Sequence, residues 1–288
     1  MNLFMPPLVW SLAIGLPIPS LASELVSPPL SAQPTTDSLA QLAPPPDTGS
    51  PSRPARGGGS YFRLPDPPPG TPPEGRRRGG ATRGTVNQGA CPKLPIGLTA
   101  LVPAIGEPTT DAAPVSTVQV WGNTTLAQPT FWFYNPYPQA ADYSARFELR
   151  RDGSSESVYK TSLVLPNQPG IVGLPLPNTV SLEVNQRYRW FLTVDCNPLS
   201  DATPVSVEGV IQRVAVSPDL SRSLSTASAV EKASLFAKAG VWYDALTILA
   251  ELRQQNSQAA TDWQTLLKEV GLSDLADKSI VDCCKAEQ

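Results

Sequence analysis

The distribution of proline limits what this chain can fold into more than any other feature. Proline has no backbone N–H and a fixed φ, so it is excluded from helix interiors and central strands. Of the 33 prolines in the 288 residues, 14 lie between residues 24 and 90, together with ten glycines. This stretch has too few large apolar side chains to offset the entropy cost of ordering. We therefore expect residues 23–90 to be a disordered linker rich in Pro, Gly and Arg.

The chain begins with an apolar segment. Residues 3–21 are apolar except for two serines and four prolines, and Ser20-Leu21-Ala22 places small residues where a signal peptidase reads them. The segment is interrupted by proline and is shorter than the ~20 residues that a spanning helix needs. Residues 1–22 are thus predicted to be a signal peptide. We expect the mature protein to lack a transmembrane segment and to be exported to the periplasm or outer cell envelope.

The four cysteines are Cys91, Cys196, Cys283 and Cys284. An even number in an exported protein indicates two disulfides, whereas a reducing compartment would leave free thiols. A zinc site is less favoured, because no pair has the C-x-x-C spacing. A bridge between the adjacent Cys283 and Cys284 would form a strained ring. We therefore expect each of these two to pair outward, one with Cys91 and the other with Cys196.

Residues 91–216 show the alternation that is typical of β-strands. In the run 143–150, Tyr143, Ala145, Phe147 and Leu149 share one face and the polar residues share the other. Asp152-Gly153 then predicts a hairpin turn. The other predicted strands are 116–121, 130–134, 158–165, 172–176, 188–196 and 205–214. Seven short strands separated by turn residues predict an antiparallel β-sandwich of the immunoglobulin or fibronectin III type.

One spacing within the predicted sandwich supports this class. Leu182 precedes Tyr188 by six residues, and Tyr188 begins an alternating strand. This resembles the tyrosine corner of immunoglobulin-like sandwiches, in which the phenol bonds back to upstream backbone.

Beyond residue 216 the period changes from two to about 3.6, which predicts three or four helices in residues 217–288. Ser228 and Glu231 form a capping box ahead of the first clear helix, and Gly240 follows it as a C-cap candidate. Gly240 to Ala245 resembles the turn of a tetratricopeptide repeat. A stable array needs about three repeats and only one is visible, so a single helical hairpin packed on the sandwich is favoured.

The landmarks taken together resemble the domain of unknown function 928 family of exported cyanobacterial proteins. They are Thr82-Arg83-Gly84 ahead of Cys91-Pro92, residues 129–134, Tyr188-Arg189-Trp190, residues 207–209, residues 240–246, residues 249–253 and Cys283-Cys284. The likeness covers roughly residues 80–284. It implies an envelope protein of a cyanobacterium and implies no activity.

The composition argues against an enzyme. The sequence contains no histidine, which removes the commonest general base, the His-dependent nucleophile systems and most catalytic zinc sites. No glycine pattern typical of phosphate or dinucleotide binding is present. A carboxylate pair could still hydrolyse glycosides, but the candidates lie on polar strand faces or in turns, where a solvated surface explains them. No catalytic residue, cofactor or metal is predicted.

The aromatic run at 131–134 offers a candidate binding site. In a strand, Trp132 and Tyr134 point away from Phe131 and Phe133. With Tyr137, they are candidates for a platform that stacks against a sugar or a proline-rich partner. The alternative, which we favour, is that the C-terminal helices cover them, because such a strand is apolar on both faces.

The last candidate is the Arg/Gly stretch from Arg76 to Gly84. Such stretches bind nucleic acid in other contexts, but export makes a nucleic-acid partner unexpected here. An anionic envelope polymer or membrane surface is a better partner, and a solvated linker is the simplest interpretation. These observations predict a non-catalytic exported module that binds a protein of the envelope. The alternative is a carbohydrate- or peptidoglycan-binding module that uses exposed aromatics.

Overall fold

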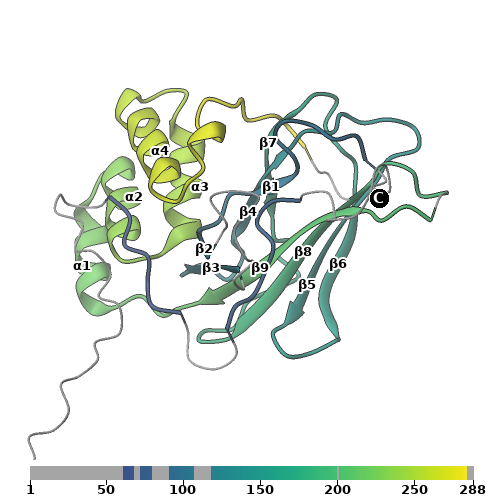
Figure 1. Ribbon diagram of the computed structural model, residues 1–288. Helices are drawn as coiled ribbons and strands as arrows, with labels where there is room; N and C mark the ends of the chain where they lie inside the picture. Colours follow the sequence, from purple (N-terminus) through teal and green to yellow (C-terminus); the bar gives the residue numbers. More distant parts are fainter. Residues whose placement is uncertain (1–60, 68–71, 80–90, 107–117, 200, 284–288) are drawn as a thin grey trace, which may run out of the picture. The chain divides into compact units, whose positions relative to one another are not determined.

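The computed structural model describes residues 61–67, 72–79, 91–106, 118–199 and 201–283. Within them, nine strands form two sheets, and four α-helices follow the last strand (Figure 1). The predicted signal peptide, most of the predicted linker and Cys284 lie outside the described residues. No helix in the described ranges is both long and apolar enough to cross a membrane.

The smaller sheet has three strands in the order β1-β4-β7: β1 (Thr99–Ala100), β4 (Thr130–Asn135) and β7 (Gly170–Pro175). The larger sheet has six in the order β2-β3-β9-β8-β5-β6. Its strands are β2 (Ala104–Ile105), β3 (Gln119–Thr124), β5 (Ser144–Arg151), β6 (Ser157–Leu163), β8 (Arg187–Asp195) and β9 (Val205–Arg213). All seven predicted strands are present within a few residues.

The pairing of β3 with β9 corrects one expectation, because these two strands run parallel whereas an entirely antiparallel sandwich was predicted. Parallel neighbours need a long crossover connection. Here the chain forms all of β4 to β8 between them, so local turn signals give no information about this pair.

The core between the sheets is aromatic. Phe131 and Phe133 project from β4 towards the larger sheet. There the ring centroid of Phe147 on β5 lies 4.9 Å from that of Phe131. The ring centroid of Trp190 on β8 lies 5.6 Å from that of Phe133. All four side chains are buried. The inward positions are those that the period-two alternation predicts.

The helices are α1 (Pro218–Thr226), α2 (Ala229–Lys238), α3 (Trp242–Leu252), α4 (Ser257–Glu269) and the short 3-10 helix η1 (Ser273–Leu275). The predicted capping box of Ser228 and Glu231 begins α2. Gly240 has φ +75°, a conformation that favours glycine, and it separates α2 from α3.

Helix α3 joins the helices to the sheets (Figure 1). Its Trp242 indole donates a hydrogen bond of 2.8 Å to the carbonyl of Leu101, and Trp132 of β4 donates one of 3.0 Å to the Thr247 hydroxyl. The helices therefore cover the outer side of β4, as the apolar character of that strand on both faces indicates.

Residues 72–79, which we call the strap, overturn part of the linker prediction. The strap makes β-bridges from Glu74 to Gln119 of β3, from Arg76 to Glu208 of β9 and from Arg78 to Thr99 of β1. It thus connects the two sheets, through β1 of the smaller and β3 and β9 of the larger. A Cβ on Gly75 would lie 2.6 Å from the Glu208 carbonyl oxygen, so glycine permits the close approach.

Residues 61–67 are also packed on the folded part, which extends the correction. The ring of Phe62 is buried and meets that of Trp242 edge-on at 4.9 Å. The backbone N–H groups of Tyr61 and Phe62 donate to the Glu269 carboxylate. The linker prediction was wrong for these residues because their partners lie about 200 residues further along the chain, where no local pattern reveals them.

The disulfide pairing was also predicted wrongly. Cys91 is bonded to Cys196, with their Cα atoms 4.8 Å apart, so neither pairs with the C-terminal cysteines. Cys283 is itself disulfide-bonded. Cys91 and Cys196 meet because residue 91 lies beside the end of β8, where the sulfur of Cys91 is 3.7 Å from the Val194 carbonyl oxygen. The C-terminal chain is held instead by β7, whose Ile171 exchanges backbone hydrogen bonds with Ser279 and Val281.

Candidate docking surface

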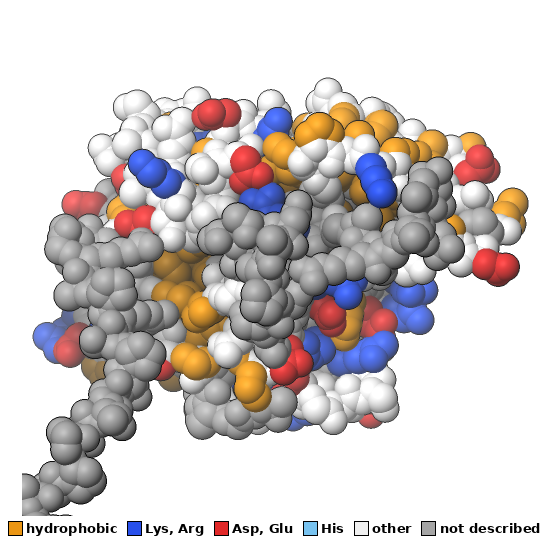
Figure 2. Space-filling model, in the orientation of Figure 1, with side chains coloured by type: hydrophobic (Ala, Val, Ile, Leu, Met, Phe, Trp, Pro, Cys, Tyr) orange, Lys and Arg blue, Asp and Glu red, His pale blue; other side chains and the backbone are white. Residues whose placement is uncertain are grey.

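The outward side of β5, β6 and β8 is the sheet surface that carries charge. We call it the outer face, and its members are Arg146, Glu148, Arg150, Lys160, Ser162, Arg187, Arg189 and Phe191. Their common orientation follows from register, because Glu148 lies opposite both Lys160 of β6 and Phe191 of β8. The intervening residues, such as Phe147 and Trp190, point into the core. Figure 2 shows basic side chains gathered over this part of the sheet, with a few acidic ones among them.

Ion pairs hold part of the outer face in place. Arg150 donates from Nε to Glu148 at 2.7 Å, and the Ser157 hydroxyl donates to the same carboxylate. The hydrogen bond from Arg150, with that from Ser157 and the nearby cationic charges, lowers the pKa of Glu148 to about 2, despite partial burial. Glu148 is therefore ionised at neutral pH and fixes the position of Arg150.

Two further arginines of the outer face form ion pairs with the turn after β5. Arg187 and Arg189 lie 2.8 Å and 3.5 Å from the two carboxylate oxygens of Asp152. Asp152 is in the predicted Asp152-Gly153 turn, where Gly153 has φ +81°. The turn thus supplies the counter-charge that allows two arginines to lie close together on β8.

Phe191 lies in the middle of these charges. Its ring is half-buried, and the Arg150 guanidinium lies 5.0 Å from its centroid. An aromatic side chain on the outward side of a strand offers rigid apolar contact area, and the arginine stacked on it is held in place by Glu148. Such a combination is typical of protein-binding surfaces.

Arg146 and Lys160 are the cations of this face that remain available. Both are exposed, and in the part of the chain that the structure describes neither side chain forms a hydrogen bond or an ion pair. Their charge is consequently directed to solvent. The sequence signal for this surface is the outward position of Phe191 among polar neighbours, and Phe191 was not among the predicted site residues.

The predicted stacking residues lie elsewhere and are buried. Trp132, Tyr134 and Tyr137 are only 7%, 7% and 4% exposed. Besides the bond from Trp132 to Thr247, the Lys278 ammonium lies 5.9 Å from the Tyr134 ring, and the Asn135 amide donates to the Tyr137 carbonyl. Burial, and to a lesser degree Tyr143, raises the pKa of Tyr137. Trp132 lies against α3, as the apolar character of both faces of β4 predicts, and the burial of all three residues means that they form no exposed platform.

The hydrogen bond expected of a tyrosine corner is present at Tyr188. The Tyr188 phenol oxygen accepts from the Glu183 backbone N–H at 3.0 Å, next to the fully buried Leu182. This bond ties the start of β8 to the loop before it, which is a structural role.

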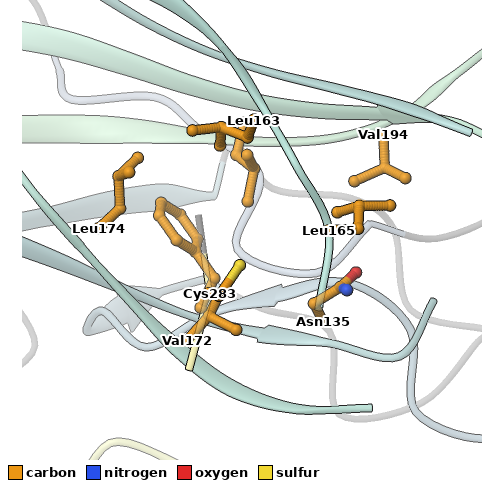
Figure 3. Close-up of a pocket in the computed structure, with 9 residues that line it drawn as sticks. Asn135, Leu163, Leu165, Val172, Leu174, Val194 and Cys283 are labelled. Carbon is orange, nitrogen blue, oxygen red and sulfur yellow. The ribbon is translucent and has the colours of Figure 1, made fainter. Parts of the chain in front are cut away.

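A small pocket lies between the two sheets. Leu163, Leu165 and Val194 line it together with Val172, Leu174 and Cys283 (Figure 3). Its lining is apolar, and it has room for about one water-sized molecule. A cavity of this size and character accommodates at most a small apolar group.

The described residues show no metal site, and their most buried carboxylate is part of the fold. No group of three or more Cys, Asp or Glu side chains is placed to hold a metal ion in those ranges. The most deeply buried carboxylate, Asp244, accepts hydrogen bonds from Thr124 and Thr125 and joins α3 to β3. Desolvation raises its pKa, and its hydrogen bonds to two residues of the sheet region give it a structural role.

Comparison with known proteins places the chain in a family without indicating a reaction. No curated protein matches the sequence. The sequence does match the profile described as Domain of Unknown Function (DUF928) over residues 78–280, which is more than half of the chain. This matched range includes both sheets, the helices and the outer face. The protein therefore belongs to the DUF928 family.

Proposed function

We propose that this protein is a non-catalytic, exported module of the cell envelope that binds a partner protein through its outer face. The observation that carries the proposal is the contrast between the two sheets. Helices cover the outer side of β4, whereas β5, β6 and β8 present Arg146, Lys160 and the half-buried Phe191 to solvent. An aromatic centre with a charged rim suits protein recognition.

The compartment and the fold type belong to this proposal. The Cys91–Cys196 disulfide supports export, because such bonds persist in oxidising compartments. The Tyr188 hydrogen bond supports an immunoglobulin-like sandwich, a fold whose members commonly act by binding. The carbohydrate-binding alternative depended on exposure of Trp132, Tyr134 and Tyr137, and their burial removes that support.

The test is capture of the partner by the tagged protein from its native envelope after chemical crosslinking. The wild type is compared with the double variant Arg146→Glu/Lys160→Glu. The matched control is Lys238→Glu/Lys268→Glu, which makes the same charge change at exposed positions on the helices α2 and α4. We expect a defined protein to be captured by the wild type and the control and lost with the outer-face variant. Capture of polysaccharide alone would contradict the proposal.

A further inference from the structure

Strand β6 is the open edge of the larger sheet. It pairs with β5 on one side, and no residue from 157 to 163 makes a backbone hydrogen bond to any other segment that the structure describes. Its seven residues span roughly 23 Å at the usual rise of a strand. Figure 1 shows β6 at the margin of the sheet, away from the helices. Unpaired backbone groups along such an edge are a template for another strand.

The edge has little of the protection that isolated edges usually carry. Natural edge strands are blocked by proline, by charged side chains such as lysine, by β-bulges or by a covering loop. The β5–β6 pair has one register shift, between Leu149 and Arg150, which affects only the start of β6. Residues 157–163 contain no proline, and their one charged residue, Lys160, points outward beside Glu148. Val158 is 39% exposed at the start of the strand. The opposite edge of the sheet differs, since β3 is bridged there by the strap and by β2.

The two sides of β6 would meet different side chains of an added strand. On the outer face, an added strand would lie beside Lys160 and Ser162 of β6, with Arg146 of β5 on the next strand. On the inner side, the added strand would lie beside Tyr159, Thr161 and Leu163 of β6. Leu163 also lines the apolar pocket. Alternate side chains of a strand point to opposite faces, so a complementary segment alternates acidic with apolar residues.

We propose that β6 accepts an extended segment of the partner protein as an added strand, with acidic side chains beside Lys160 and Arg146 and apolar ones beside Tyr159 and Leu163. This inference rests on the proposed function, since it specifies how the outer face binds its protein partner. Main-chain hydrogen bonds to β6 supply affinity, and the alternation supplies specificity.

The experiment places a photo-crosslinking amino acid at Ser162, which is exposed on β6, and in a control protein at Lys93, which is exposed elsewhere. Both full-length proteins are irradiated in the native envelope, and the crosslinked peptides are identified by mass spectrometry. We expect crosslinks from position 162, and few from position 93, to map to a partner segment with alternating acidic and apolar residues. A synthetic peptide of that segment is then titrated against the wild type and against Arg146→Glu/Lys160→Glu. We expect about tenfold weaker binding to the variant, as two exposed ion pairs are lost.

Hydrogen exchange of the backbone amides distinguishes strand addition from binding through charge alone. Amide hydrogens of residues 157–163 should exchange more slowly when the peptide is bound, and a peptide with alternate backbone nitrogens methylated should not bind. Crosslinks from position 162 to a helix or to polysaccharide, or unchanged exchange in β6, would overturn the inference. If a protein is captured through the outer face but β6 stays unprotected, only strand addition fails. If no protein is captured by any version, the proposed function fails.

Discussion

Asp244 is the residue at which burial and charge conflict most directly. It is 2% exposed in the first turn of α3, and its carboxylate accepts a hydrogen bond of 2.7 Å from the Thr124 hydroxyl and one of 3.2 Å from the Thr125 backbone N–H. A buried carboxylate is tolerable only when such donors surround it. The residue therefore links the helices to the sheets, and removing it leaves buried donors without an acceptor.

Replacing this carboxylate should be costly for the fold. We expect Asp244→Ala to lower the free energy of unfolding by about 3 kcal/mol, because the Thr124 hydroxyl and the Thr125 N–H lose their acceptor in a buried site. Urea denaturation measures the change. The control is Asp142→Ala in an exposed turn, which should change stability by less than about 0.5 kcal/mol. Equal effects of the two substitutions would contradict this role.

The free energy of unfolding should depend on acid pH through Glu148. Its pKa in the folded protein is about 2, below the ordinary value of 4.5, so its ionised form stabilises the fold above about pH 4.5. That contribution is lost as the pH falls from about 4.5 towards 2. The difference in unfolding free energy between wild type and Glu148→Gln should therefore shrink between pH 6 and pH 3. Asp244 titrates in the opposite sense but is common to both proteins, so it cancels. A difference that does not vary with pH would count against the Arg150–Glu148 pair.

At the scale of elements, the strap shows how a proline- and arginine-rich segment can be part of a fold. Arg77 is 4% exposed and donates to the carbonyls of Val102 and Val270, which belong to the sheet region and to the end of α4. Arg78 makes two hydrogen bonds, of 2.8 and 3.0 Å, with Asp274. The arginines thus satisfy carbonyl and carboxylate groups that the helices would otherwise leave unpaired.

This arrangement predicts a large difference between two arginines of the same N-terminal region. Arg77→Met should reduce the free energy of unfolding by about 3 kcal/mol, since charged hydrogen bonds to buried carbonyls are lost. Arg63→Met, at an exposed position, should change it by less than about 0.5 kcal/mol. Thermal and urea unfolding of both variants would measure the contrast. Similar stabilities would mean that the strap does not contribute to the fold.

At the scale of the whole molecule, the Cys91–Cys196 disulfide closes a loop of 105 residues that contains most of both sheets. A bridge across so long a loop restricts the unfolded chain and is expected to contribute about 4 kcal/mol. We expect Cys91→Ser/Cys196→Ser to unfold at lower urea concentration by a corresponding amount while keeping its far-UV circular dichroism spectrum. A variant as stable as the wild type would show that the sheets and helices hold these ends together without the bridge.

What the sequence determined by itself is the local structure. The seven longer strands, the capping box of Ser228 and Glu231, the positive φ of Gly240 and the Asp152-Gly153 turn all follow from interactions among residues close in the chain. Periodicity, capping and turn preference act over a few residues, so a single sequence reveals them. The same alternation placed Arg146, Lys160 and Phe191 on one side of the sheet, although it could not show that this side stays uncovered.

The tertiary structure decided what depends on which distant segments meet. It paired Cys91 with Cys196, set β3 parallel to β9, buried Tyr137, and built Phe62 and Arg77 into the fold. None of these outcomes has a local signal, because each reflects the burial and hydrogen bonding that become available only when segments up to about 200 residues apart come together. A proline-rich composition indicates that a segment cannot form its own core, but the strap shows that such a segment can still order against a core made by the rest of the chain.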